Sequence, residues 1–347
     1  MFQLRDYQID LQIQIRQCFA NGESRVLAVM PTGAGKTVTF ADIARRAEAR
    51  NNRVLILTHR REIQRQTVAK LYEGGVITGQ IVSGGIHTFH HKVQVGMVQT
   101  VAKRLHKVPK PDLIIIDEAH HLLAKSWQSV VNQWPDVPRI GFTATPERLD
   151  GRGLGEDGLF TAMVMGPQIR ELVKMGNLAY PVMCRPEREF HAEYHVKRGD
   201  YDTKEQEHEF SKKAVIGNVI EHYRDKLDGL PAIGFTPTVE TAFRLAEDFT
   251  DAGFRAVAVH GSMSDSERDN AIKGLSDGSI QVVFSCDVIS EGVDVPVVSG
   301  AMLLRRTMSL GLYLQQCGRA LRMFPGKDRA YILDHAGNRW IHGHVLE

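Results

Sequence analysis

Short apolar runs rich in β-branched residues alternate along this chain with helix-length polar segments. Five runs occur in the first part of the sequence and four in the second: residues 26–30, 54–57, 93–98, 113–116 and 140–142, then 232–235, 256–259, 281–284 and 301–304. Runs without polar alternation are typical of parallel strands that helices cover on both faces. Two series of strand–helix units predict an α/β chain with two doubly wound parallel-sheet lobes.

The boundary between the lobes is predicted within residues 150–213. Residues 150–158 include four glycines and indicate a loop, whereas residues 185–213 are charge-rich with weak periodicity, which is typical of an exposed excursion. A chain of 347 residues accommodates two domains. We therefore expect a first lobe over residues 1–170, a linker or insert over 171–213 and a second lobe over 214–347.

The net charge of +2 conceals a difference between the two halves. Residues 1–170 contain 22 Lys and Arg against 15 Asp and Glu, a net charge of +7, whereas residues 171–347 contain 21 against 26, a net charge of −5. The total makes no case for a polyanionic partner. The basic first half nevertheless favours a phosphate-bearing track there, with binding that weakens steeply as salt increases.

Targeting and membrane signals are not found in the sequence. The first eight residues lack the basic segment and apolar run of a leader, and no stretch approaches 18 apolar residues, so we expect no membrane association. The four cysteines are scattered, which argues against a disulfide framework and CxxC zinc ligands. We expect an intracellular, cytoplasmic location, with nucleoid association if the source is bacterial or phage.

Two groups of histidines raise the alternative of a zinc site. The groups are His87, His90 and His91, and His191, His195 and His208. Neither includes a cysteine or a tight helical carboxylate–histidine set, so exposed loop histidines are the favoured interpretation.

A glycine-rich loop follows the first predicted strand and opens a predicted helix over residues 38–50. Residues 31–37 read Pro-Thr-Gly-Ala-Gly-Lys-Thr. In a P-loop, glycines let backbone N–H groups face phosphates at the N-terminus of a helix. We predict that Lys36 reaches the β- and γ-phosphates and that Thr37 is a Mg²⁺ ligand. Met30 stands where the strict pattern has its first glycine, and the alternative is a glycine turn beside a surface lysine.

An acidic pair directly follows the fourth apolar run. Asp117 and Glu118 begin the sequence Asp-Glu-Ala-His. A carboxylate at the end of a buried strand near a P-loop is placed to hold Mg²⁺ through its water shell, so we assign that role to Asp117. Glu118 is predicted to orient and deprotonate the attacking water. The alternative is an acidic surface turn, and His121 receives no role.

The glycine loop and the Asp-Glu-Ala-His sequence together resemble the superfamily 2 DEAH-type helicases and translocases. The resemblance continues in order from residue 4 to residue 338. Residues 304–316 and 332–338 look most like RadD-type repair helicases and XPB-like DNA translocases. Arg306 stands where those relatives tend to have proline, and the zinc-binding extension of RadD-like proteins has no counterpart in the residues present.

The resemblance implies two RecA-like lobes in tandem, with ATP and Mg²⁺ in the cleft between them. It implies that Gln8 reads the adenine beside Arg5, that Arg319 and Arg322 act as arginine fingers, and that His120 meets Gln315 across the cleft. The spacing of the two arginines puts them on one helix face, for which the alternative is a solvated basic surface. The other implied residues are Thr32, Gly33, Ala34 and Gly35 in the P-loop, Gly292 and Asp294 at the ribose, and Thr143 and Thr145 for coupling.

The resemblance also implies a nucleic-acid track along strand ends of both lobes. Hydroxyl, imidazole and backbone N–H groups bind phosphates without reading sequence. The candidates are Thr58, His59, Arg60, Gln99, Thr100, Thr236, His260, Gly261 and Ser285. The alternative for each is an ordinary turn residue.

We therefore expect a nucleic-acid-stimulated ATPase that translocates on DNA or remodels it in repair, replication or recombination. The alternatives are an RNA helicase and an ATP-gated nucleic-acid clamp or motor subunit that works with a partner. Because the two lobes use most of the chain, substrate choice is expected to come from residues 150–213, from the lobe surfaces or from a protein partner.

Overall fold

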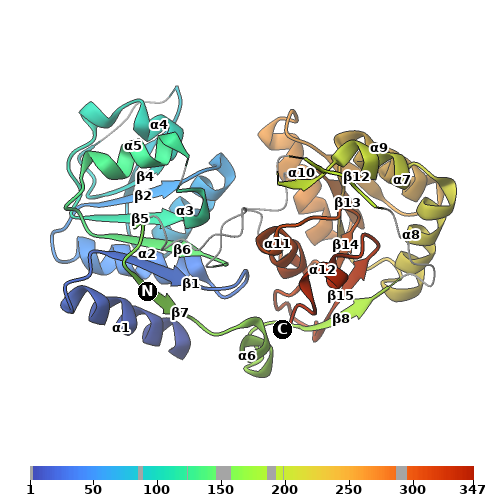
Figure 1. Ribbon diagram of the computed structural model, residues 1–347, viewed down its shortest axis with the longest axis horizontal. Helices are drawn as coiled ribbons and strands as arrows, with labels where there is room; N and C mark the ends of the chain where they lie inside the picture. The colour runs from blue at the N-terminus through green and yellow to red at the C-terminus, as the bar shows by residue number, and fades with distance from the viewer. Residues whose placement is uncertain are drawn as a thin grey trace. The chain divides into compact units, whose positions relative to one another are not determined.

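The computed structural model describes residues 3–84, 89–122, 124–145, 158–185, 193–197, 199–286 and 295–347. The chain forms two compact units, Met1–Pro167 and Gln168–Glu347, and each is built around its own parallel sheet (Figure 1). The predicted α/β architecture with two doubly wound parallel-sheet lobes is confirmed.

The first unit contains a seven-stranded sheet in the order β3-β4-β2-β5-β6-β1-β7, and all of its neighbouring strands are parallel. The strands are β1 (Arg25–Val29), β2 (Val54–Thr58), β3 (Thr78–Ile81), β4 (Val93–Met97), β5 (Leu113–Asp117), β6 (Arg139–Thr143) and β7 (Ala162–Met165). The helices are α1 (Asp6–Ala20), α2 (Lys36–Glu48), α3 (Arg61–Glu73), α4 (Val98–Ala102) and α5 (Lys125–Gln133), with short 3₁₀ turns η1 (Leu105–Lys107) and η2 (Ala119–His121).

The strand order of the first unit determines where its site lies. The central strands are buried on both faces, as their continuous apolar runs predict, and Phe40 of α2 packs against Phe142 of β6 with ring centroids 5.5 Å apart. Strands β5, β6 and β1 are neighbours, so their carboxyl ends meet at one edge of the sheet. In open α/β sheets this edge is where ligands bind.

The second unit contains a six-stranded parallel sheet in the order β12-β13-β11-β14-β15-β8. Its strands are β8 (Tyr180–Cys184), β11 (Ala232–Phe235), β12 (Ala256–Val259), β13 (Val282–Ser285), β14 (Gly300–Leu303) and β15 (Arg329–Asp334). Its helices are α6 (Ile169–Lys174), α7 (Thr203–Phe210), α8 (Lys213–Lys226), α9 (Val239–Asp251), α10 (Asp265–Asp277), α11 (Leu310–Ala320) and α12 (Asn338–His342).

Residues 171–213, expected as a linker or insert, contribute regular structure to the second unit. Strand β8 pairs with β15 at the edge of the sheet, from Tyr180 opposite Arg329 to Cys184 opposite Leu333. A small antiparallel hairpin follows, formed by β9 (Val196–Lys197) and β10 (Asp200–Tyr201), and α7 comes directly after it. Edge strand β8 is partly exposed, with Tyr180 at 54%, and it contains Pro181, whereas the apolar runs of the central strands have no proline.

A buried histidine pair lies beside the sheet of the second unit. His335 follows β15 and is almost fully buried, and its Nε2 lies 3.1 Å from Nδ1 of His222 in α8. Burial, with a smaller contribution from the neighbouring His222, lowers the pKa of His335 to about 3. The ring is therefore neutral in the folded protein at neutral pH.

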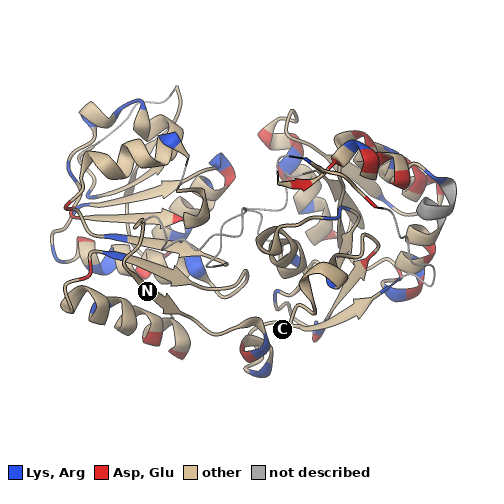
Figure 2. Ribbon diagram, in the orientation of Figure 1, with Lys and Arg blue, Asp and Glu red and all other residues tan. Residues whose placement is uncertain are grey.

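The charge difference between the two halves has a visible origin in the fold. Helices α7, α9 and α10 of the second unit carry most of the acidic residues of that unit's helices (Figure 2). Among the described residues, no helix is long and apolar enough to cross a bilayer.

Candidate nucleotide-binding site

The glycine-rich loop connects the end of β1 to the start of α2. Gly33 and Gly35 have φ angles of 86° and 82°, a left-handed conformation that costs glycine nothing. A Cβ atom on Gly35 would lie 2.5 Å from Nε2 of Gln8, so any other residue would displace the end of that side chain. The first turn of α2 has no acidic residue. The positive end of the helix dipole is therefore left for an anion, as a P-loop requires.

Side chains of helix α1 form hydrogen bonds with backbone carbonyls of the glycine loop. The Tyr7 hydroxyl donates to the carbonyl of Ala34 at 3.0 Å, and Nε2 of Gln8 donates to the carbonyls of Ala34 and Gly35 at 3.2 and 3.3 Å. The backbone N–H of Arg5 donates to Oε1 of Gln8 at 2.9 Å. Gln8, predicted to read adenine, is thus buried against the loop, and adenine recognition stays a prediction. Tyr7 was missed, although it directly precedes Gln8 in the sequence.

Lys36 and Glu118 form an ion pair between the glycine loop and the acidic motif. Nζ of Lys36 lies 3.1 Å from Oε1 of Glu118, and the two side chains are only 11% and 13% exposed. Glu118 has a φ of 51°, which is uncommon for a residue other than glycine and marks local backbone strain. Asp117 at the end of β5 is buried and accepts a hydrogen bond from the Glu118 N–H at 3.1 Å. Glu118 therefore contacts the glycine loop through Lys36, and Asp117 directly precedes it at the end of β5.

A hydrogen-bonded group links the acidic motif to the end of β6. Nδ1 of His120 lies 3.3 Å from Oγ1 of Thr143 and 3.5 Å from Oε2 of Glu118. The Thr143 hydroxyl is buried and donates to the carbonyl of Thr145 at 2.9 Å. The three residues predicted to couple nucleotide state to motion thus contact one another through Thr143, and His120 also contacts the acidic motif.

Three histidine rings form a row at the same edge of the sheet. The rings of His120 and His121 have centroids 4.2 Å apart, and those of His121 and His59 have centroids 4.7 Å apart. His59 follows β2 and was predicted to contact nucleic acid, whereas His121 was given no role. His121 therefore connects a predicted track residue to the nucleotide site.

The arginine-bearing helix of the second unit is α11. Gln315 and Arg319 are four residues apart on this helix and are 4% and 6% exposed, and Arg322 follows its last residue and is half-buried. The structure thus places Gln315 in the middle of this helix, Arg319 near its C-terminal end and Arg322 two residues beyond it. Their roles stay a prediction.

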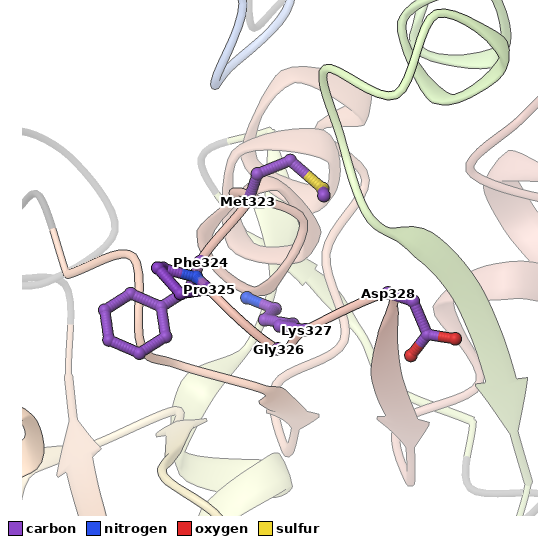
Figure 3. A pocket seen from close by; sticks show the side chains of 6 residues that line it. All are labelled: Met323, Phe324, Pro325, Gly326, Lys327 and Asp328. Atoms are coloured by element: carbon purple, nitrogen blue, oxygen red, sulfur yellow. The ribbon is translucent and has the colours of Figure 1, made fainter.

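The chain turns directly after Arg322, through residues 323–328 (Figure 3). The side chains of Phe324 and Asp328 point to opposite sides of this turn. Nζ of Lys327 donates to the carbonyl of Pro296 at 3.1 Å and to that of Val298. Burial, with a smaller contribution from the charge of Arg322, lowers the pKa of Lys327 to about 8. The turn is therefore bonded to the segment that follows the predicted ribose residues Gly292 and Asp294, which lie outside the described residues.

The predicted nucleic-acid contacts all follow the carboxyl ends of parallel strands, but they differ in exposure. Thr58, Thr236 and Ser285 are at most 1% exposed, and the Thr236 hydroxyl donates to the carbonyl of Thr238 at 2.9 Å. Thr100 is also buried, His59, Arg60 and His260 are half-buried, and Gln99 and Gly261 are exposed. Contact with nucleic acid stays a prediction for all of them.

The histidine groups considered for zinc lie only partly within the described residues. His87 and His191 lie outside the described residues. The rings of His90 and His91 are 4.1 Å apart, and His195 pairs with Glu205 at 2.8 Å. In the part of the chain that the structure describes, no group of three or more His, Cys, Asp or Glu side chains is arranged to hold a metal ion.

Known proteins similar to this chain fall into several groups. A 51.5 kDa protein of a Lactococcus phage is 33% identical over 90% of the chain, and IRC3 of Saccharomyces cerevisiae, named as a candidate ATP-dependent helicase, is 28% identical over 96% of it. The chain spans 66% of the phage protein and 51% of IRC3, so it is shorter than both.

Solved structures show the same fold. A fragment of a candidate HsdR subunit of a type I restriction enzyme from Vibrio vulnificus matches with a TM-score of 0.78 at 19% identity, over 98% of this chain and 67% of that one. Dbp5 of S. cerevisiae, solved with RNA and ADP BeF3, matches with a TM-score of 0.64 at 19% identity, over 97% of this chain and 89% of that one.

Two parallel-sheet units, the first with a P-loop and an acidic pair and the second with an arginine-bearing helix, define a two-lobed P-loop protein of the helicase class. Residues 1–148 match the family described as type III restriction enzyme, res subunit, and residues 211–324 match the family described as helicase conserved C-terminal domain. These matches in both units are consistent with superfamily 2 of the helicases.

Proposed function

We propose that the chain is a DEAH-type motor that hydrolyses ATP and uses the energy to translocate on DNA or remodel it, as in DNA repair. The observation that carries the proposal is the little-exposed ion pair of Lys36 and Glu118, 3.1 Å apart between a glycine loop and the end of β5. A cation and a general base at a P-loop are the parts that phosphoryl transfer to water needs.

The residues present fit ATP with Mg²⁺. The N-terminus of α2 lacks acidic residues, and the left-handed Gly33 and Gly35 shape the loop in front of it. Thr37 stands in the first turn of α2. Asp117 ends β5 and directly precedes Glu118, which pairs with Lys36 of α2, so the two provide the hydroxyl and the carboxylate that the ion requires. Bound Mg²⁺ would neutralise charge on the phosphates.

In the proposed mechanism, Lys36 leaves Glu118 and pairs with the phosphates. Glu118 is then free to orient a water molecule and accept its proton. His120, in contact with both Glu118 and Thr143, holds the carboxylate in position from the other side. Arg319 and Arg322 would add positive charge at the γ-phosphate, an effect that amounts to roughly 10³–10⁵ in rate for arginine fingers. Hydrolysis would then depend on closure of the two units around ATP and nucleic acid.

DNA is the proposed track, since the chain resembles DNA repair helicases and DNA translocases most closely in residues 304–316 and 332–338. A similarly folded restriction-modification enzyme, LlaBIII, was solved bound to DNA, with a TM-score of 0.69. RNA is the alternative, because Dbp5 was solved bound to RNA and a protein 26% identical to this chain is named ATP-dependent RNA helicase SrmB. The charge of +7 on residues 1–170 supports either polyanion.

The setting of the motor is also part of the proposal. We propose an intracellular protein. We also propose that its substrate specificity comes from protein segments outside these two lobes, either in a longer chain or in a partner protein, because the similar proteins are longer than this chain.

The test is the rate of phosphate release without nucleic acid and with single-stranded DNA, duplex DNA, forked DNA and RNA. We expect DNA to stimulate turnover, and the stimulation to fall as salt increases. Stimulation of ATP turnover by RNA alone would show that the track is RNA and not DNA. An absence of turnover under every condition would favour an ATP-gated clamp.

A further inference from the structure

The loop that leads into the arginine-bearing helix is held by side chains from distant parts of the chain. Residues 304–309 connect β14 to α11. We infer that the hairpin of β9 and β10, together with α7, positions this helix for catalysis, and that Asp200 and Gln206 are its positioning residues. The inference rests on the proposed function, since it assumes that Arg319 acts on ATP.

Asp200 in the hairpin binds three residues of the loop. Its Oδ2 accepts hydrogen bonds from Nη2 of Arg305 at 3.2 Å and from the Thr307 hydroxyl at 3.0 Å. Its Oδ1 accepts from the Met308 N–H at 2.8 Å. Hydrogen bonds to a charged acceptor are the stronger kind, so this single carboxylate fixes both side chain and backbone of the loop.

Gln206 in α7 binds a fourth residue of the loop, Arg306. Its Oε1 accepts from the Arg306 N–H at 2.7 Å, and its Nε2 donates to the Arg306 carbonyl at 3.2 Å. Gln206 is fully buried, and the Arg306 guanidinium lies 5.3 Å from the centre of the Tyr201 ring. The hairpin and α7 therefore contact every residue from Arg305 to Met308, about 100 positions away in sequence.

A second support holds the loop from α12. The side chain of Asn338 accepts from the Thr307 N–H at 2.9 Å and donates to the Arg305 carbonyl at 2.8 Å, and Nε2 of His342 lies 2.8 Å from the Thr307 carbonyl. Asn338 is fully buried. The loop is thus fixed by α12 and by the hairpin with α7, and loss of one support leaves the other in place.

The hydroxyl of Thr307 connects Asp200 to the start of α11. It donates to Asp200 and accepts from the N–H of Ser309 at 3.0 Å. Ser309 is the N-cap of α11, and its hydroxyl accepts from the Leu312 N–H at 3.2 Å. Gln315 and Arg319 stand on this same helix. A change at Asp200 therefore reaches the helix through two hydrogen bonds.

Small displacements at this helix matter because a shift of about 1 Å in a catalytic group can cost roughly a hundredfold in rate. Residues 193–210 were expected only as part of a linker or insert. The contacts of Asp200 and Gln206 instead assign this segment a structural role, which is to fix the start of α11 and therefore the position of Arg319.

The first test is Asp200→Asn, which keeps the shape and removes the charge. The matched control is Asp202→Asn in the same hairpin region, because Asp202 bonds to Lys204 and Lys197 and not to the loop. We expect Asp200→Asn to lower kcat about tenfold or more and to leave the ATP affinity within about twofold. Asp202→Asn should keep the wild-type kcat. A wild-type kcat for a folded Asp200→Asn protein would overturn the inference.

The decisive readout is a double-mutant cycle with Arg319→Ala. If Asp200 acts through Arg319, Asp200→Asn should have little further effect on single-turnover hydrolysis in the Arg319→Ala background. The same fold-loss in both backgrounds would mean that Asp200 does not act through Arg319. If Arg319→Ala itself hydrolyses ATP at the wild-type rate, the arginine-finger assignment in the proposed function fails instead.

A second variant keeps the test informative if Asp200→Asn fails to fold. Thr307→Val removes the hydroxyl that joins Asp200 to Ser309 and conserves side-chain volume. It should lower kcat with unchanged ATP affinity, and Asp200→Glu, which restores the charge, should recover part of the activity. A wild-type kcat for Thr307→Val would contradict the proposed connection.

Discussion

Glu118→Gln is expected to bind ATP more tightly than the wild-type protein while losing turnover. In the structure, Nζ of Lys36 is 3.1 Å from Oε1 of Glu118, and neither side chain is more than 13% exposed. The phosphates of ATP must therefore compete with Glu118 for Lys36. Glutamine keeps the shape of the side chain but removes the charge, so Lys36 becomes available and one negative charge near the phosphates is lost.

The size of the effect follows from the geometry of the pair. Two unit charges 3.1 Å apart attract by about 5 kcal/mol at an effective dielectric constant of about 20. Lys36 regains most of this attraction from the phosphates, so the net gain is closer to that of one hydrogen bond to a charged group, roughly 1.5–3 kcal/mol. We therefore expect the dissociation constant for Mg·ATP to fall about tenfold to a hundredfold.

Isothermal titration calorimetry on the wild-type and variant proteins measures this directly. Glu73→Gln is the matched control, because Glu73 pairs with Lys70 at 2.6 Å on the surface of α3, where an ion pair contributes little. Glu73→Gln should bind ATP as the wild type does. If Glu118→Gln bound ATP no more tightly than Glu73→Gln, the competition between Glu118 and phosphate would be refuted.

Three further predictions follow from other contacts. Gly35→Ala should weaken ATP binding at least tenfold and destabilise the protein by roughly 1–2 kcal/mol, because φ is 82° and the new Cβ would lie 2.5 Å from Gln8. ATP titration measures the first effect and thermal unfolding the second, and a wild-type ATP affinity would contradict the prediction. His121→Ala should reduce stimulation by nucleic acid more than basal turnover, since its ring contacts both His59 and His120; equal losses in the two rates would argue against it. His335 has a folded-state pKa of about 3, below its ordinary 6.5, so the unfolded chain takes up the proton first as the pH falls. The free energy of unfolding therefore decreases as the pH falls from 6.5 toward 3, by at most about 1.4 kcal/mol per pH unit. Denaturant unfolding from pH 7 to 5 should show a flatter profile for His335→Gln, and parallel profiles would contradict this.

The central strands and the glycine loop could be predicted from sequence because their signals are local. Strands β1 and β5 are largely apolar runs. Lys36 and Glu118 belong to the motifs that begin where these strands end. Edge strands β7 and β8 could not be predicted in the same way. Their sequences, Ala-Met-Val-Met and Tyr-Pro-Val-Met-Cys, each contain a single β-branched residue, and β8 also contains a proline, which disfavours a strand assignment.

The contacts that position the site were not predictable because they join residues far apart in sequence. Tyr7 reaches the carbonyl of Ala34 across 27 positions, and Asp200 reaches Thr307 across 107. Neither residue carries a spacing or composition that marks it. The alternation of helices and strands predicts that the carboxyl ends of the parallel strands lie at one edge of each sheet. The hydrogen bonds between side chains at that edge depend on packing that only the folded chain shows.

The most direct test of the account is ATP turnover by the wild-type protein with and without duplex DNA, measured beside Glu118→Gln. The account predicts that DNA raises the wild-type rate severalfold and that Glu118→Gln does not turn over ATP with or without DNA, although it binds ATP. A wild-type rate that DNA leaves unchanged, matched by the rate of Glu118→Gln, would contradict both the assignment of the site and the proposed motor function.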